Sequence, residues 1–434
     1  MLIELVSLYW AICTALFLGI WLKPSPRLWV AAMMASGWQV AALLWLNILA
    51  VKAGWWSFFE SRWMLQGIPV SLYIGWVVLW GVVAVFLAHI RGTRLGVLWM
   101  TIAGLALFDL VVMPQMNPVL ILGDYWLIGE FVLLFGSLLP GMLLARWVLM
   151  DRYVEWRAAM ISSAFVVILL GVCPLAGGDG YDDFLSVWRG RESWMNWGIS
   201  GLVFFAGVPA LAGVRQFVIS GRGTPIPFDP PKTLVSEGVY GYCANPMQLS
   251  MAAVLIFWAL LWHSWVSLGL AVVSVAYAQG LAKWSETEDL KRRHGKRWLL
   301  YQSVVPRWRF RIFPYLSPDQ DRSPARLYVA SRCDVCSEVR HWFSMKESTG
   351  LMLCAAEDYP GHPLDRITYI SASGEVQARG IDAVACAFQH LHVGWAYLGW
   401  LMQFPGIMQI LQLAMDTSGA GKFQMDGSAV KNEK

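Results

Sequence analysis

The stretch Asn245–Lys283, NPMQLSMAAVLIFWALLWHSWVSLGLAVVSVAYAQGLAK, holds two apolar runs joined by the short turn WHSW. Each run is close to the length that crosses about 30 Å of hydrocarbon. The turn is too short to form a domain, so both ends of the hairpin are expected on the same side of a membrane. The stretch therefore predicts a transmembrane helical hairpin.

Apolar runs of similar length recur through the first 283 residues. The chain is 57% hydrophobic and 14% charged, whereas a soluble domain carries about 25% charged residues. The first run follows no basic segment and precedes no small-residue cleavage site, so we expect a retained span rather than a signal peptide. We predict a polytopic α-helical membrane protein with about nine transmembrane helices, near residues 2–22, 28–51, 67–90, 95–115, 125–148, 157–177, 193–214, 245–263 and 265–283.

Lys and Arg gather in alternate loops, such as KPSPR after the first run and HIRGTR after the third. By the positive-inside rule these loops are cytoplasmic, which places the N-terminus outside and the C-terminus in the cytoplasm. We expect a bacterial inner or plasma membrane location among membrane lipids. The net charge of +4 is spread over the loops and gives no reason to expect a nucleic-acid partner. The aromatic segment GWWSFFESRW (54–63) predicts a short interfacial helix.

Polar residues gather at the two ends of the hairpin, in GVYGYCANPMQLS (238–250) and SETEDLKRRHGKRWLLYQSVVPR (285–307). Because the hairpin returns to its starting side, the two segments are expected to meet. Taken alone, Asn245 is a good helix N-cap and Pro246 suits a first helical turn. On that interpretation the tyrosines anchor the chain at the interface and KRRH is a cytoplasmic flank.

The two segments resemble the isoprenylcysteine carboxyl methyltransferase and phospholipid methyltransferase family of integral membrane enzymes. The family pattern reads roughly G-x-Y-R-Y-x-R-[HN]-P-M-Y-x-G, then a hydrophobic hairpin, then E-E-x-x-L-x-x-x-F-G-x-x-Y-x-x-Y-x-x-x-V-P-R. The residues that match it here are Gly238, Tyr240, Tyr242, Asn245, Pro246, Met247, Glu286, Leu290, Gly295, Tyr301, Val305, Pro306 and Arg307.

The resemblance implies an S-adenosylmethionine-dependent methyltransferase that acts on a lipidic acceptor entering from the bilayer. Its cofactor carries a sulfonium, an ammonium and a carboxylate, which suit a carboxylate such as Glu286, a neutral group such as Asn245, and aromatic faces near the cation. Catalysis would rest on positioning and water exclusion. The implied cofactor-binding residues are Tyr240, Tyr242, Asn245, Pro246, Met247, Glu286, Gly295, Tyr301 and Arg307.

The chain departs from the family pattern at several positions. The loss of an Arg before Asn-Pro removes a strong donor to carboxylates, and the loss of the second Glu weakens the hold on an amine. Arg292, Arg293 and Glu288 are candidates to replace these charges. The departing residues are Ala244 for Arg, Gln248 for Tyr, Ser250 for Gly, Thr287 for Glu, His294 for Phe and Trp298 for Tyr.

The C-terminal segment has the composition of a soluble domain. RLYVASRCDVCSEVRHWF (326–343) predicts a strand, a loop and an amphipathic helix, followed by strand-like TGLMLCAA and DRITYISASGEVQARG and a helix near 381–390. Cys333 and Cys336 fall at the strand-to-helix junction, where a helix N-terminus lowers a thiol pKa. No second Cys-x-x-Cys or spaced His pair completes a zinc tetrad, so we predict no metal. A structural cysteine pair is the plain alternative.

This segment resembles the thioredoxin-like family of the DCC type, which opens with Y-D-G-x-C-x-x-C. Tyr328 matches, while Ala330 and Ser331 replace Asp-Gly. The resemblance implies a thiol–disulfide domain in which Cys333 and Cys336 are catalytic and a redox partner is needed. We therefore expect a small C-terminal α/β thioredoxin-like domain and three parts: a multi-span membrane domain (1–219), a methyltransferase-like domain (220–317) and a cytosolic thioredoxin-like domain (318–434).

Two acidic residues, Asp109 and Glu130, lie within apolar runs. Ionisable groups at membrane depth are costly and suggest function by default. The plain alternative places Glu130 near an interface and Asp109 between helices, with Gln39 and Asn47 as polar partners. For the whole chain, two alternatives to a methyltransferase stay open: a non-catalytic lipid-binding scaffold, and a membrane-anchored thiol–disulfide oxidoreductase.

Overall fold

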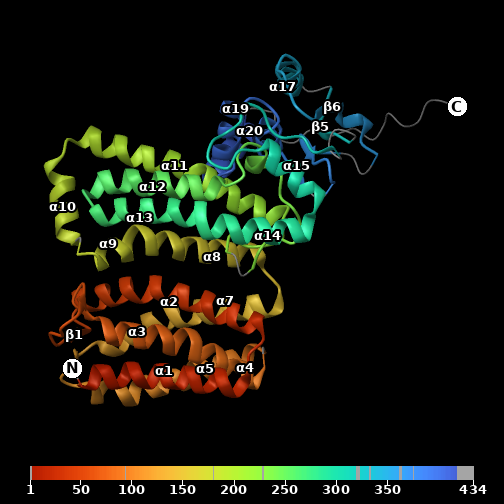
Figure 1. Ribbon diagram of the computed structural model, residues 1–434. Helices are drawn as coiled ribbons and strands as arrows, with labels where there is room; N and C mark the ends of the chain where they lie inside the picture. The colour runs from red at the N-terminus through yellow and green to blue at the C-terminus, as the bar shows by residue number, and fades with distance from the viewer. Residues whose placement is uncertain are drawn as a thin grey trace. The chain divides into compact units, whose positions relative to one another are not determined.

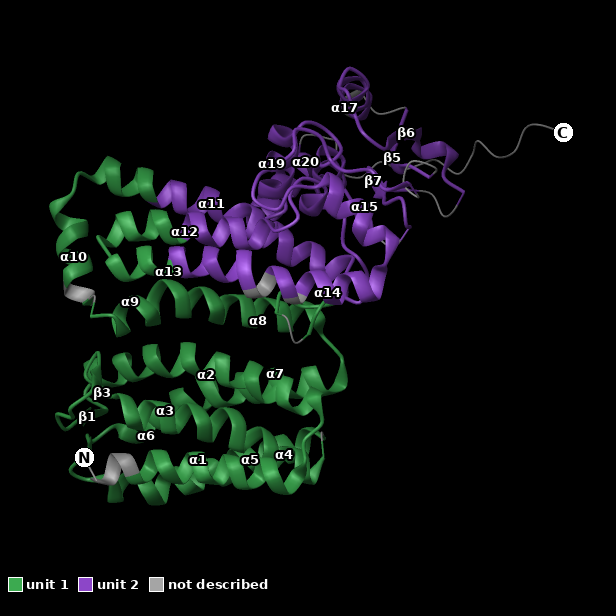
Figure 2. Ribbon diagram, viewed as in Figure 1, with its two compact units in different colours: residues 1–199, 223–230, 255–270 green, residues 200–222, 231–254, 271–434 purple. Residues whose placement is uncertain are grey.

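The computed structural model describes residues 2–92, 94–178, 180–226, 229–318, 323–331, 334–360, 364–374 and 376–417. Contacts between residues divide the chain into two compact units, shown in green and purple in Figure 2. Unit 1 comprises residues 1–199, 223–230 and 255–270, and unit 2 comprises residues 200–222, 231–254 and 271–434. Both motif segments and the whole C-terminal segment therefore belong to unit 2.

Long helices make up most of unit 1, and several of them contain a π-helical or 3-10 segment (Figure 1). Single π turns shift the register of a helix and often occur near functional positions. The helical runs are α1 (Leu2–Leu22), α2 (Pro26–Lys52), α3–η1–α4 (Val70–Val78, Leu79–Val83, Ala84–Arg91), α5–η2 (Leu95–Val112, Met113–Met116), α6–η3–α7 (Trp126–Leu133, Leu134–Leu138, Leu139–Met150), α8–η4–α9 (Val154–Val167, Ile168–Val172, Cys173–Ala176), α10 (Tyr181–Gly190) and α11 (Ser193–Ile219), which continues into unit 2.

In the described part of the chain, six helices are long and apolar enough to cross a membrane: Pro26–Lys52, Val70–Arg91, Leu95–Met116, Trp126–Met150, Val154–Ala176 and Ser193–Ile219. Three shorter apolar helices, Val6–Leu22, Pro246–Trp262 and Trp265–Gly280, lie in the remaining predicted runs. These helices support a polytopic integral membrane protein. The count of nine spans and the cytoplasmic C-terminus stay predictions.

Small and capping residues determine how the helices of unit 1 begin and pack. Ser25 caps α2, because its hydroxyl accepts a hydrogen bond from the main-chain N–H of Leu28, and Pro26 occupies the first turn. Gly81 in η1 lies against Ser36 of α2: a Cβ there would lie 2.2 Å from the Ser36 Oγ and 2.8 Å from its Cα. The close approach of these two helices therefore requires glycine.

The prediction of an interfacial helix at 54–63 is wrong. Residues Trp56–Phe58 form strand β1, which pairs antiparallel with β4 (Leu120–Leu122), and β2 (Met64–Leu65) pairs with β3 (Ile68–Pro69). Trp56 is only 2% exposed, and its indole N–H donates to the Oδ1 of Asn47 at 3.2 Å. The segment is thus drawn into the helical core by a buried aromatic side chain, and strand pairing satisfies its backbone.

Unit 2 combines the motif ends of the hairpin helices with a small sheet (Figure 1). Its helical part contains η5 (Gly238–Gly241), residues 246–254 of α12 (Pro246–Trp262), residues 271–277 of α13 (Trp265–Tyr277), η6 (Ala278–Ala282), α14 (Lys283–His294) and α15 (Lys296–Val304), while residues 255–270 of the hairpin belong to unit 1. The C-terminal part contains β5 (Ala325–Val329), α17 (Asp334–Ser344), β6 (Leu351–Ala355), η7 (Ala356–Asp358), β7 (Thr368–Ile370), β8 (Gln377–Arg379), α18 (Ile381–Phe388), α19 (Val393–Met402) and α20 (Ile407–Thr417).

The sheet has the order β6-β5-β7-β8. β5 and β6 run parallel, with Leu327 opposite Leu353, and β7 pairs antiparallel with both β5 and β8. The sequence-predicted strands and the helix near 381–390 are therefore confirmed. The thioredoxin-like assignment and the boundaries at 219 and 317 stay predictions.

Candidate active site at the ends of the hairpin

The first motif segment forms a tight turn before α12. Gly238 has a φ of +61°, a conformation that favours glycine. Tyr240 is buried and stacks on Phe217, with ring centroids 4.9 Å apart and an interplanar angle of 10°. Gly213 on α11 leaves room for this arrangement, because a Cβ there would lie 2.9 Å from Met247 and 3.3 Å from the Tyr240 hydroxyl. The turn is thus closely packed against α11.

Three hydrogen bonds to main-chain carbonyls join the described residues of the first motif segment to those of the second. The main-chain N–H of Ala244 donates to the carbonyl of Pro306 at 2.9 Å. The thiol of Cys243 donates to the carbonyl of Arg307 at 3.2 Å. The hydroxyl of Tyr301 donates to the carbonyl of Tyr240 at 2.7 Å. The prediction that the two segments meet is therefore confirmed.

A polar cluster lies where the segments meet. The Asn245 Nδ2 donates to the Gln248 Oε1 at 2.8 Å, and the Gln248 Nε2 lies 3.5 Å from the Glu286 Oε1. On the other side of the cluster, the Arg307 Nη2 donates to the Thr287 Oγ1 at 3.0 Å. A carboxylate and a guanidinium are thus both held by neutral neighbours.

Burial shapes the electrostatics of this cluster. It raises the pKa of the Glu286 carboxyl, while the Arg307 charge acts in the opposite direction. Burial also lowers the pKa of Arg307 and raises that of Tyr240 well above its ordinary value. The Arg307 Nη1 and the Tyr240 hydroxyl are buried and have no hydrogen-bond partner among the residues that the structure describes. Such atoms are costly in a folded protein unless a ligand or water pairs with them.

A comparison with known protein families finds a match that includes the hairpin. Residues 201–297 match the phospholipid methyltransferase family. This match contains the first motif segment, the hairpin and Glu286, and it ends before Tyr301 and Arg307. It supports a membrane methyltransferase of the phospholipid or isoprenylcysteine type. No curated protein and no solved structure matches the chain.

The other predicted cofactor residues of this methyltransferase segment have local structural contacts. Pro246 begins α12, and Met247 packs against the buried cluster around Tyr240. Gly295 has a φ of +53° at the junction of α14 and α15. The Tyr242 hydroxyl lies 2.7 Å from the Leu391 carbonyl and 3.0 Å from the Gln389 carbonyl, which share its single proton, so it contacts the C-terminal part of the chain. Whether these residues also bind a cofactor stays a prediction.

Three charged residues are expected from the sequence to replace the lost charges. Of these, Arg292 and Arg293 both pair with Asp289 on α14, at 2.9 and 3.0 Å, and Glu288 is exposed. The residues that do contact the charged pair are Gln248 and Thr287, which sequence comparison marks only as departures from the family pattern. Thr287 adjoins Glu286 in the sequence, whereas no charged residue adjoins Gln248, so its hydrogen bond toward Glu286 depends on the fold.

The C-terminal part of unit 2 packs against the motif turn and α11. Arg215 on α11 makes a bidentate pair with Asp382 on α18, at 2.9 Å to both oxygens. Trp400 on α19 meets the Tyr242 ring edge-on, with centroids 5.6 Å apart. The motif turn is therefore supported by a segment that lies outside the family match.

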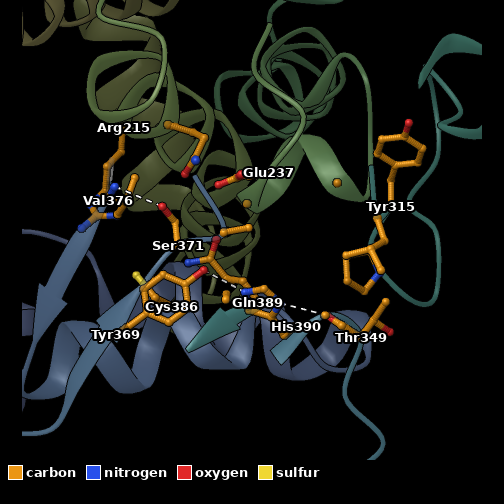
Figure 3. A pocket seen from close by; sticks show the side chains of 18 residues that line it. Arg215, Glu237, Tyr315, Thr349, Tyr369, Ser371, Val376, Cys386, Gln389 and His390 are labelled. Carbon is orange, nitrogen blue, oxygen red and sulfur yellow. Dashed lines mark hydrogen bonds between the residues drawn. The ribbon is translucent and has the colours of Figure 1, made fainter. Parts of the chain in front are cut away.

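Figure 3 shows a cavity with an accessible volume of about 50 Å³ between the motif turn and this C-terminal part. Its lining includes Glu237, Tyr369 and His390. The His390 Nδ1 lies 2.9 Å from the Thr349 carbonyl, which can only accept, so its Nε2 accepts from the Tyr369 hydroxyl at 2.8 Å. Burial lowers the pKa of His390 and favours this neutral form. The described lining residues include none of the predicted cofactor-binding ones.

The predicted redox pair is only partly visible. Cys333 lies outside the described residues, and Cys336 is buried near the start of α17 and is disulfide-bonded. The fold places this residue after strand β5, at the strand-to-helix junction that the sequence indicates. A thiol–disulfide function for the pair stays a prediction.

The acidic residues of unit 1 are buried as the sequence suggests. Asp109 and Glu130 are 2% and 4% exposed, and their carboxyl groups interact electrostatically. Gln39 and Asn47 are not their hydrogen-bond partners: Gln39 bonds with Ser137, and Asn47 accepts from Trp56. Glu130 is thus buried within the protein, and its depth in the membrane stays a prediction.

Proposed function

We propose that the chain is an integral-membrane, S-adenosylmethionine-dependent methyltransferase that acts on a lipidic acceptor. The observation that carries the proposal is the cluster at the ends of the hairpin. There Glu286 and Arg307, both in the second motif segment, present opposite charges, and the Arg307 Nη1 is buried without a hydrogen-bond partner among the described residues. The family match at residues 201–297 supports the same chemistry.

The residues present fit this cofactor. Glu286 would hold its ammonium group, and Arg307 would hold its carboxylate through the unpaired nitrogen. The buried Tyr240 hydroxyl, which feels the charge of Glu286, would offer a further hydrogen bond. When bound, S-adenosylmethionine supplies a methyl group activated by its sulfonium. The chain's own residues would contribute orientation and the exclusion of water.

A lipidic acceptor suits the surroundings of the cluster. The hairpin helices expose apolar side chains in unit 2, and Val272, Val273 and Tyr277 are all more than half exposed. In a membrane this face of α13 would meet lipid. An acceptor in the bilayer would then reach the cofactor site without crossing bulk water.

The test is methyl transfer in a membrane. Purified protein in lipid nanodiscs would be incubated with methyl-labelled S-adenosylmethionine, and extracted lipids would be separated to find the labelled product. We expect label in a lipid fraction with the natural chain and with Glu288→Gln, and its loss with Glu286→Ala and Arg307→Ala. Binding without any transfer would favour the lipid-binding scaffold, and neither binding nor transfer would overturn the proposal.

A further inference from the structure

Glu286 and Arg307 interact electrostatically without a direct ion pair between them in the described part of the chain. Each charge lowers the cost of burying the other, yet the two are not within 4.0 Å. Opposite charges in a half-buried site would normally close on each other, because direct contact recovers desolvation cost. Something must therefore keep them apart.

Two neutral side chains occupy the positions that would do so. Thr287 accepts from the Arg307 Nη2 at 3.0 Å and leaves the Nη1 unpaired. Gln248 is itself oriented by Asn245, whose Nδ2 donates to its Oε1 at 2.8 Å. With its oxygen so engaged, the Gln248 amide must turn its NH₂ group toward the Glu286 carboxylate, 3.5 Å away.

We infer that Gln248 and Thr287 are positioning residues that hold Glu286 and Arg307 as a separated pair of charges for the zwitterionic, amino-acid end of the ligand. The inference rests on the proposed function. Gln248 makes one hydrogen bond to Glu286, and Thr287 makes one to Arg307. The remaining hydrogen-bonding positions of each charged group are then free to bind the ligand. A ligand with an ammonium and a carboxylate on one carbon would satisfy both charges at once.

Two ligands separate this role from a structural one. S-adenosylhomocysteine carries the amino-acid end, and 5′-methylthioadenosine has the same nucleoside and sulfur but lacks that end. Binding of both to purified protein in detergent would be measured by calorimetry for the natural chain, Gln248→Met, Thr287→Val, the conservative Thr287→Ser and the exposed neighbour variant Glu288→Gln.

We expect Gln248→Met and Thr287→Val to weaken S-adenosylhomocysteine binding by about ten- to a hundred-fold, the range for lost hydrogen bonds to charged groups. Binding of 5′-methylthioadenosine should stay within about two-fold, and Thr287→Ser and Glu288→Gln should retain the natural affinities for both ligands.

Natural-chain affinities for S-adenosylhomocysteine in both Gln248→Met and Thr287→Val would overturn the inference while leaving the proposed function intact. Equal loss for both ligands would also overturn it, because it would indicate a general structural effect. If the natural chain binds neither ligand, the proposed function itself fails.

Discussion

The Tyr301 hydroxyl donates a hydrogen bond to the main-chain carbonyl of Tyr240, 2.7 Å away, and so joins the end of the second motif segment to the first. Both side chains are almost completely buried. The bond spans sixty-one positions of sequence, and both hairpin helices lie between its ends. This hydrogen bond therefore holds the two motif segments together.

Replacing Tyr301 with Phe tests this contact. The variant keeps the ring but leaves the buried Tyr240 carbonyl without its donor, so we expect a loss of about 1–3 kcal/mol in the free energy of unfolding. Chemical denaturation in detergent measures it. Tyr277→Phe, at a tyrosine that is 52% exposed, is the matched control and should be nearly neutral. Equal stability of the two variants would argue against a structural role for the bond.

The titration of Glu286 predicts two opposite pH effects. Burial raises the pKa of this carboxyl above its ordinary value of 4.5, and only the ionised form attracts an ammonium group. Affinity for S-adenosylmethionine should therefore fall as the pH drops through the raised pKa. The free energy of unfolding should instead gain from the drop, because the native carboxyl holds its proton to a higher pH than the unfolded one.

Calorimetric binding titrations and denaturation curves at several pH values would measure both effects of Glu286. In Glu286→Gln, the fall in affinity at low pH should be absent, and so should the gain in the free energy of unfolding. An affinity that does not vary with pH in the natural chain would contradict this role for the carboxylate.

The pair between Arg215 and Asp382 predicts how strongly the C-terminal part is anchored to α11. Both side chains are about one-quarter exposed, and Asp382→Asn should lower the free energy of unfolding by about 1–2 kcal/mol. A double-mutant cycle with Arg215→Gln isolates the coupling. Asp365→Asn is the control, because its pair with Arg379 is 4.0 Å long and more than half exposed. Equal effects of the two aspartate changes would contradict the anchor.

The packing of Gly81 against Ser36 predicts a steric effect in unit 1. Gly81→Ala would place a methyl group 2.8 Å from a main-chain Cα, and overpacking of this kind costs about 1–3 kcal/mol. Gly104→Ala, in a helix position with nothing within 4 Å, should be neutral or slightly stabilising. Unfolding by a denaturing detergent compares them, and a Gly81→Ala protein as stable as Gly104→Ala would rule out the close approach.

Much of the helical fold follows from the sequence alone. Runs of apolar residues predict helices because their length and hydrophobicity are local properties, and Asn245-Pro246 predicts the start of α12 for the same reason. The structure of residues 54–63 is not predictable in this way, because their aromatic side chains suit both an interfacial helix and a buried strand. The strand is favoured by the hydrogen bond between Trp56 and Asn47 and by pairing with β4, and both partners belong to other elements.

The site is predictable in its charges but not in its neutral residues. Glu286 and Arg307 can be picked out among the many charges of residues 285–307 because both match the family pattern. Gln248 and Thr287 look like losses until the fold places each beside a charge. Tyr242 gives the converse case: its position in the motif suggests a ligand, whereas its hydroxyl contacts carbonyls nearly 150 residues away.

The central claim is that the two ends of the hairpin form one cofactor pocket, and equilibrium binding of labelled S-adenosylmethionine to the purified protein tests it most directly. We predict saturable binding by the natural chain and by Glu288→Gln. Glu286→Ala and Arg307→Ala should each weaken it by at least about ten-fold, because each removes one charge from the pocket. Absence of saturable binding, or natural affinity in both alanine variants, would contradict the account.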